Sequence, residues 1–542
     1  MGKRFAVTAL IIVAFGAILG GVLGKFPAAT SADTSVTPAK IAADYREAVE
    51  VINNKYVTPI DHEKVLNTSI QGMLWSLDPH SQFFTREDFR KLFEEQQSQF
   101  YGIGVSIMQH RDGVYVQSVI PGTPADQAGV RYGDRFVEVD GKDAREWSSA
   151  EVSKNVRGEG GSKVKIKIER VASPKPIDLE ITRGGVPLPS IRNYFMLSNG
   201  VGYVGLTGGF QETTADELND ALATLEKQGM TSLVLDVRGN PGGLLPQAIA
   251  VVSRFIPSGK TVVSVKGRSR YAASQELKSR GNTPDRIPLI VMINGGSASA
   301  SEIVAGSVQD YGRGLVVGSD SFGKGLVQRV FPLPFGTGLT LTTARYYTPF
   351  GRTIQRDYSS GSIYEYYSNG NNGGDGEAPK PKPAGVPTTL PDGRTLMSGR
   401  GIEPDVVAKA AEFTPLTFRL NDAVFYFARQ LVAGKIAGFE DLRVEKQNQQ
   451  WSIPKDAFIV SDKLFEAFRA YAVSDKANGL TAENINSMAN HARMRIRMEL
   501  ATANYSNEAG VQVILESDPQ ILKAIEVMPE ATRLAGNNLA SK

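Results

Sequence analysis

Residues 287–310 read IPLIVMINGGSASASEIVAGSVQD, and this stretch decides the fold class. Its first part, IPLIVMIN, is apolar without polar alternation, which is typical of a strand buried on both faces. The glycine pair permits a sharp turn, and the following residues favour a helix that begins near Ser299. A strand, a tight turn and a helix in this order indicate a layered α/β domain.

The same pattern recurs on both sides of this stretch. Upstream, LVLDVRG at 233–239 predicts a buried strand, GNPGG a tight turn, and residues 245–255 a helix. Downstream, GLVVGSD at 314–320 and GLTLTTARYYT at 338–348 predict further strands. We therefore expect an α/β core over residues 190–411.

Ser299 and Lys324 are the chain's best candidates for a catalytic nucleophile and its general base. The sequence has no cysteine, which excludes thiol catalysis, and four histidines: His62, His80, His110 and His491. None of these lies between residues 111 and 490, where the glycine-rich turns gather, so a Ser–His–Asp triad is disfavoured. A serine activated by a lysine amine is the remaining nucleophilic option. His80 is interpreted as a structural residue, because we expect no site near it.

Lys324 must be neutral to accept the proton of Ser299. The ordinary lysine pKa is about 10.4 and a useful base works near 7–8, a difference of about 4 kcal/mol that burial of an ammonium can supply. The apolar neighbours Phe322 and Leu326 favour such burial. Gln328, four residues further on, is predicted to orient the amine.

Backbone N–H groups around Ser299 are predicted to bind an oxyanion. The start of a helix presents free N–H groups and partial positive charge, so the Ala300 N–H is the first expected donor. The GNPGG turn offers a second donor, at Gly242 or at Gly243. Asp310 would lie about 16 Å from Ser299 along an unbroken helix, so it is interpreted as structural.

The N-terminus indicates export. Lys3 and Arg4 precede the apolar run Phe5–Gly24, and small residues follow at 28–32, which is typical of a signal peptide. The apolar run, of about 20 residues, is also long enough for an uncleaved membrane anchor. The formal net charge of +3 on 542 residues predicts neither nucleic acid nor a strongly charged substrate as a partner.

These motifs resemble those of the C-terminal processing (tail-specific) serine peptidases. The resemblance covers residues 41–407 and rests on the order of these motifs: LDPHSQFF, YGIGVSI, PGTPADQAGVRYGDRFVEVDG, LVLDVRGNPGGLL, GGSASASEIVAGSVQDYGRGLVVG, SFGKGLVQ, LTTARYYTPFGRTIQ and GIEPD. It implies Ser299 as nucleophile, Lys324 as base and Gln328 as the family's glutamine. The middle serine of GSASAS is selected because it lies 25 residues before Lys324, as in the family.

The resemblance also implies a domain organisation. The fold class is α/β and multidomain, with a crotonase-like catalytic core and an inserted β-rich PDZ domain. The expected segments are a signal peptide or anchor (1–33), a helical N-terminal region (40–95), the PDZ domain (98–185), the catalytic domain (190–411, with a mobile Gly/Asn/Pro loop at 359–390) and a helical C-terminal region (412–542).

The PDZ domain implies a binding groove for a peptide C-terminus. The carboxylate-binding loop would comprise Tyr101, Gly102, Ile103 and Gly104, and the peptide would add as a strand beside residues 105–107. Val152 and Val156, on a helix predicted at 149–156, would form the apolar pocket for the terminal side chain.

The resulting hypothesis is an exported serine endopeptidase of the periplasm or cell envelope. It would bind protein C-termini that end in apolar residues and would need no metal or organic cofactor. Membrane contact through the N-terminal segment, a homodimer and an adaptor protein are left open. Two rivals are a non-catalytic PDZ scaffold, which would bind tails without cleaving them, and a crotonase-type acyl-CoA enzyme, which would turn over CoA thioesters.

Overall fold

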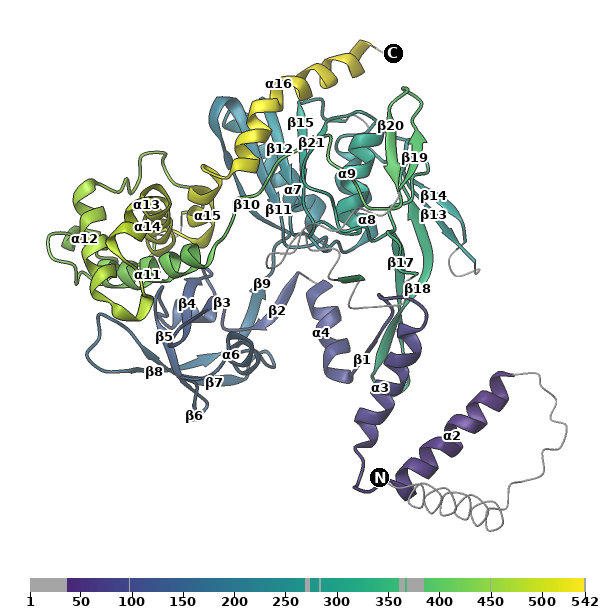
Figure 1. Cartoon of the computed structure of the whole chain (residues 1–542), viewed down its shortest axis with the longest axis horizontal. Helices are drawn as coiled ribbons and strands as arrows, with labels where there is room; N and C mark the ends of the chain where they lie inside the picture. Colours follow the sequence, from purple (N-terminus) through teal and green to yellow (C-terminus); the bar gives the residue numbers. More distant parts are fainter. Residues whose placement is uncertain are drawn as a thin grey trace, which may run out of the picture. The chain divides into compact units, whose positions relative to one another are not determined.

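The computed structural model describes residues 37–96, 98–268, 273–281, 284–359, 366–367, 385–448 and 450–540 (Figure 1). The chain divides into two units, residues 1–69 and 70–542. The expected export segment and most of the expected loop at 359–390 fall outside the described residues.

The N-terminal unit contains helix α2 (Pro38–Lys55) and the beginning of α3 (His62–Trp75). Thr37 caps α2, since its side chain accepts a hydrogen bond from the backbone N–H of Lys40. No helix in the described ranges is long and apolar enough to cross a bilayer.

The second unit is built around a six-stranded sheet in the order β10-β11-β12-β15-β16-β21. All neighbouring pairs are parallel except β10 with β11. Side chains alternate between the two faces, so both faces need a cover of helices. The strands are β10 (Ile191–Met196), β11 (Val201–Leu206), β12 (Ser232–Asp236), β15 (Leu289–Ile293), β16 (Leu315–Gly318) and β21 (Val406–Val407).

Helices cover both faces of this sheet. One face packs with α7 (Thr214–Lys227), α8 (Leu245–Ser253) and α9 (Ala300–Asp310) in a large apolar core. The other face packs with α16 (Pro519–Ala540), whose Ile521 and Ala524 are fully buried there (Figure 1). The helical region expected at 412–542 therefore supplies one layer of the catalytic core.

A second sheet carries the lysine loop. It has the order β1-β18-β13-β14, with β17 paired to β18. The antiparallel hairpin of β17 and β18 begins two residues after the FGKG lysine, so the hairpin fixes the position of Lys324. The strands are β1 (Gln82–Phe84), β13 (Thr261–Gly267), β14 (Gln275–Lys278), β17 (Leu326–Pro332) and β18 (Gly338–Tyr347).

A β-rich module with its own core lies between α4 (Arg86–Gln96) and the catalytic sheet in sequence. Its strands β3 (Val105–His110), β4 (Gly113–Val119), β5 (Arg135–Val139), β7 (Lys163–Glu169) and β8 (Ile177–Thr182) pair in that order, with β6 (Lys142–Asp143) on β5. Short helix α5 (Pro124–Gln127) and helix α6 (Ser149–Val156) complete it, and α6 has the predicted bounds. Strands β2 (Gln99–Gly102) and β9 (Gly184–Pro187) pair where the chain enters and leaves.

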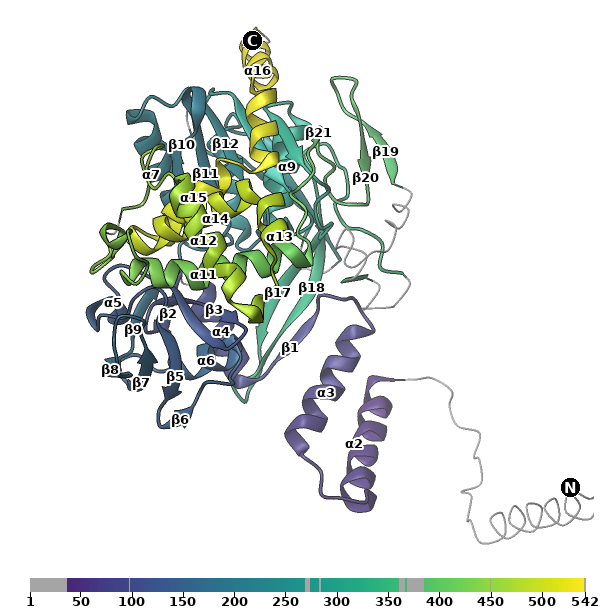
Figure 2. The ribbon, with the colours of Figure 1, turned by 60° about the vertical axis from the view of Figure 1, so that its left-hand side comes forward.

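C-terminal helices pack against this module (Figure 2). The phenol of Tyr132 donates to the buried carboxylate of Glu499 at 2.8 Å, and the His110 ring stacks on Phe425 at 3.8 Å. The helical stretch over 482–504 is interrupted at Met488. The helices are α11 (Pro415–Val432), α12 (Asp462–Ser474), α13 (Ala482–Ser487), α14 (Ala489–Asn504) and α15 (Asn507–Leu515), and a hairpin of β19 (Val386–Thr389) and β20 (Thr395–Ser398) precedes them.

Candidate active site

Ser299 occupies a strained backbone conformation at the turn between β15 and α9. It is the N-cap of α9, with φ 56° and ψ −111°. A side chain at positive φ costs about 1–3 kcal/mol and persists only where the surroundings enforce it. The strand–turn–helix geometry lifts the hydroxyl out of the sheet, as in the nucleophile elbows of α/β-hydrolases. The predicted nucleophile is thus found on the predicted kind of turn.

The hydroxyl of Ser299 contacts a residue that sequence reasoning missed. Its Oγ lies 2.8 Å from the phenolic oxygen of Tyr346 in β18. Burial raises the pKa of Tyr346 to about 12, so the phenol is neutral at physiological pH. Tyr346 lies within the motif LTTARYYT, but no local pattern indicates that it reaches a serine 47 residues away.

Lys324 lies in surroundings that favour its neutral form. Burial lowers the pKa of its amine, and this effect outweighs the charges of Glu302 and Asp78, which raise it. No hydrogen bond or ion pair to Nζ occurs among the described residues. The expectation that burial would depress this pKa agrees with the direction found.

Glu302 joins the serine segment to the lysine segment. Its carboxylate is fully buried, and Oε2 accepts the backbone N–H of Ser299 and of Lys324, each at 2.8 Å. Oε1 accepts the Gly323 N–H at 2.7 Å and the Ser321 hydroxyl at 2.5 Å. Burial raises the pKa of this carboxyl group. Four donors therefore fix Glu302 between the two loops that carry the candidate dyad.

The structure distinguishes between Gly242 and Gly243, the two glycines predicted as oxyanion donors. The Gly242 N–H donates to the side chain of Asn240 at 2.9 Å, so it is already engaged. The N–H groups of Gly243 and Ala300 have no acceptor in the part of the chain that the structure describes. A Cβ at Gly242 would lie 2.8 Å from Ser299 Cβ, so only glycine lets the turn approach the nucleophile.

Ser299 and Lys324 open onto one cavity of about 470 Å³. Gln328 lines it too, but its amide donates to Thr342 at a long 3.4 Å and makes no hydrogen bond to Lys324 within the described ranges. The rest of the wall is largely apolar. It includes Leu92, Leu188, Phe210, Gly242, Gly243, Leu244, Leu245, Leu326, Val327, Val330 and Tyr346.

His80 lies closer to the site than the sequence indicated. Burial and then the charge of Lys324 lower its pKa to about 3, so the ring is neutral. Its Nε2 pairs with the Tyr366 hydroxyl at 2.8 Å. The expectation that no site lies near His80 was wrong, because tertiary structure brings the turn at 77–84 beside the lysine loop.

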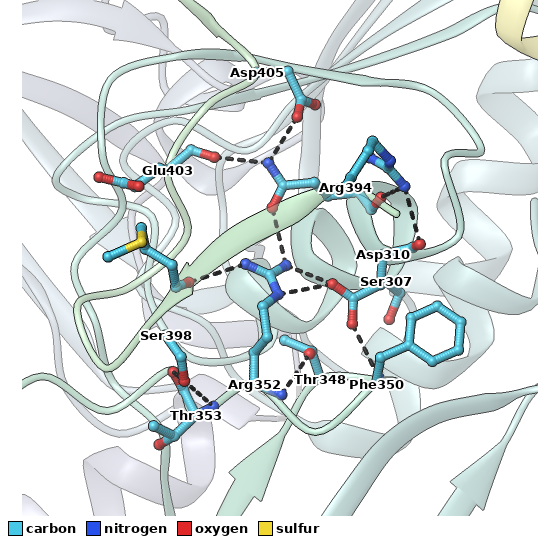
Figure 3. Close-up of polar contacts among 12 residues, drawn as sticks. Ser307, Asp310, Thr348, Phe350, Arg352, Thr353, Arg394, Ser398, Glu403 and Asp405 are labelled. Carbon is cyan, nitrogen blue, oxygen red and sulfur yellow. Dashed lines mark hydrogen bonds and ion pairs between the residues drawn. The ribbon is translucent and has the colours of Figure 1, made fainter. Parts of the chain in front are cut away.

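Asp310 has the structural role expected from its distance. Figure 3 shows its carboxylate bound to Arg352, which is itself 2% exposed. The Arg352 Nη2 donates to Asp310 Oδ1 at 2.6 Å, and the Phe350 N–H donates to Oδ2 at 3.0 Å. This buried pair holds the end of α9 to the loop after β18, away from Ser299.

The predicted peptide groove lies in the β-rich module. Strand β3 is an edge strand beside α6, so one side of its backbone is free for another strand. Tyr101 is 41% exposed, whereas Ile103, Val152 and Val156 are buried in the module core. Gly104 has φ +88°, and a Cβ there would lie 2.3 Å from Thr123. Of the predicted loop, Tyr101 and Gly102 lie in strand β2, which pairs with β9, and Ile103 and Gly104 connect β2 to the free edge of β3.

Comparison with known proteins identifies both the catalytic domain and the β-rich module. Residues 200–361 match the model of peptidase family S41, and residues 91–169 match the PDZ domain. The chain is 38% identical over 320 residues to a carboxy-terminal-processing protease of Bartonella bacilliformis, covering 58% of this chain and 73% of that protein. It is 31% identical over 368 residues to carboxy-terminal processing protease CtpB of Bacillus subtilis, covering 64% and 75%.

Among solved structures, a photosystem II D1 C-terminal processing protease is 29% identical, with a TM-score of 0.34 over 59% of this chain and 91% of the other. The glycine turn, the serine segment and the lysine loop described above all lie within the S41 match. The chain belongs to the carboxy-terminal processing serine proteases of peptidase family S41 and carries a PDZ domain.

Proposed function

We propose that this chain is an exported endopeptidase that binds C-terminal tails through its PDZ domain and cleaves them with a Ser299–Lys324 dyad. The observation that carries the proposal is that Ser299 and Lys324 line the same cavity. The loops that hold these two residues are joined by hydrogen bonds to Glu302. A nucleophile and a base fixed to one carboxylate are pre-organised for reaction.

Acylation begins with neutral Lys324. Its amine accepts the proton of Ser299 as Oγ attacks the carbonyl carbon of the scissile peptide bond. Negative charge develops on the carbonyl oxygen, where the N–H groups of Ala300 and Gly243 are the best-placed donors. The lysine ammonium then gives its proton to the leaving amine, which releases the first product.

Deacylation repeats these steps with water as the nucleophile. Lys324 accepts a proton from water, water attacks the ester carbonyl, and the proton returns to Ser299 Oγ. All atoms come from substrate, water and the protein, so the steps call on no cofactor.

The PDZ domain supplies recognition. The free edge of β3 and the loop 101–104 support binding of an extended tail, with its carboxylate on the loop N–H groups. An apolar terminal residue would pack against the module core to which Val152 and Val156 belong. Export to the periplasm or envelope rests on the basic start and apolar run of residues 3–24, and fractionation of cells tests it.

The decisive experiment measures cleavage of an unstructured protein that ends in free apolar residues. We expect wild type to cleave it, Ser299→Ala and Lys324→Ala to bind it without cleavage, and tail amidation to raise KM. Cleavage by Lys324→Ala would disprove the dyad. Binding without cleavage by wild type would favour a PDZ scaffold, against which the intact cavity argues.

A further inference from the structure

Tyr346 is the only described side chain that hydrogen-bonds to the nucleophilic oxygen of Ser299. Its ring is 6% exposed, and its hydroxyl oxygen lies 2.8 Å from Ser299 Oγ. Its backbone N–H donates to the carbonyl of Gly325 at 2.8 Å, next to Lys324. Strand β18 therefore holds the phenol at a fixed position between the serine and the lysine loop.

The direction of this hydrogen bond follows from the surroundings. The phenol has one proton, and Ser299 Oγ is the one partner that the described residues offer it. If Ser299 donated to Tyr346, the buried phenolic proton would have no acceptor, which is unfavourable. The arrangement in which Tyr346 donates to Ser299 gives the phenolic proton an acceptor among the described residues and leaves the serine proton free to point elsewhere.

We propose that Tyr346 is a third catalytic residue, which donates a hydrogen bond to Ser299 Oγ, directs the serine proton toward Lys324 and stabilises the charge that Oγ carries as this proton leaves. The proposal rests on the Ser–Lys mechanism given above and adds a residue to it. Membership of the family does not by itself assign this role to the tyrosine.

The proton balance of the step is simple. The Oγ–H bond of Ser299 breaks, its proton moves to Lys324 Nζ, and a bond forms between Oγ and the carbonyl carbon. Tyr346 keeps its own proton throughout. Its hydrogen bond strengthens as charge builds on Oγ, because hydrogen bonds to charged oxygens are stronger than those to neutral ones.

Tyr346→Phe tests the proposal, because it removes one oxygen atom and keeps the ring. Tyr347→Phe is the matched control, since it removes the same group from the next residue. The Tyr347 ring lies on the other side of the strand, with the Lys266 ammonium 4.5 Å from its centre. Two probes are used: a fluorogenic peptide that ends in three free apolar residues, and a fluorophosphonate that reacts with the serine oxygen and releases fluoride.

Tyr346→Phe should lower kcat about 10- to 100-fold, the range for a hydrogen bond to a charged group, and leave KM within about 2-fold. The rate of fluorophosphonate labelling should fall in parallel. The acidic limb of the kcat/KM profile should stay at the wild-type pH, because Tyr346 contacts Oγ rather than the lysine amine. Tyr347→Phe should match wild type in every measurement.

Other outcomes would overturn the proposal. Unchanged kcat would remove Tyr346 from catalysis, and increased kcat would make it a residue that restrains the serine. Equal losses for both tyrosine variants, with equal falls in Tm, would indicate a packing role. A Ser299→Ala control that retains activity would refute the Ser–Lys mechanism itself, whatever the tyrosine variants do.

Discussion

Ser299 and Lys324 are tied together through one oxygen atom, since the backbone N–H of each donates to Oε2 of Glu302 at 2.8 Å. The two residues are distant in sequence and belong to different loops. A buried acceptor that serves both loops sets the distance between them more firmly than packing alone. The positions of the proposed nucleophile and base therefore depend on Glu302, which does not itself line the cavity that they share.

Glu302→Gln should disable the site. A glutamine amide presents one acceptor oxygen and one N–H₂ group to the donors that now surround the carboxylate. At least one buried N–H would lose its acceptor, at about 1–3 kcal/mol. We expect lower Tm and a fall in kcat much larger than any change in KM. Glu403→Gln, which breaks the partly exposed pair with Arg400 at 2.8 Å, is the control and should stay near wild type. Full activity in the Glu302 variant would contradict this role.

Ser299→Gly should stabilise the protein although it abolishes cleavage. The φ of 56° is unfavourable for any side chain and acceptable for glycine. We expect Ser299→Gly to unfold at higher denaturant concentration than Ser299→Ala, by about 1 kcal/mol in free energy. Equal stability of the two inactive variants would show that the turn is not strained.

Lys324→Met should raise stability in a manner that depends on pH. Because burial lowers the pKa of Lys324 in the folded state, the unfolded chain binds more protons between that pKa and 10.5. Wild-type stability therefore rises with pH through this window. The variant lacks the penalty, so its advantage in Tm should be largest below the window and shrink as pH approaches 10.5. Thermal unfolding across the pH range measures this, and a constant difference would contradict it.

Asp518→Asn should weaken the GNPGG turn, which carries the proposed oxyanion donor Gly243, although Asp518 lies far from this turn in the sequence. Arg238, just before the GNPGG turn, donates to the Asp518 carboxylate at 2.8 Å and to the Gln520 side chain at 2.7 Å. Loss of this charge loosens the turn, so we expect kcat to fall several-fold, about 1 kcal/mol, at constant KM. Asp462→Asn removes a surface carboxylate that binds Arg493 and should have no effect. The same loss in both variants would indicate a general effect on the helices.

Sequence reasoning succeeded where the signal is local. The turn around Ser299, the FGKG loop of Lys324 and the bounds of α6 follow from residues close together in the chain. The roles of Tyr346 and Glu302 escaped it, because they arise from contacts between separate elements. The nearness of His80 to the lysine loop escaped it for the same reason.

The layer formed by α16 also could not be predicted. A helical pattern of apolar residues says that a face is buried, but it does not say against which sheet. The C-terminal region was therefore predicted only to be helical, whereas Ile521 and Ala524 lie in the core of the catalytic sheet.

The place of α16 in this core has a consequence for biosynthesis. A ribosome makes Ser299 and Lys324 long before it makes α16, and domains fold as units once their parts are available. Until α16 emerges, the face of the sheet that carries Val234 and Ile290 is uncovered, and the GNPGG turn lacks Asp518. The catalytic sheet therefore completes its apolar core only when α16 has emerged from the ribosome.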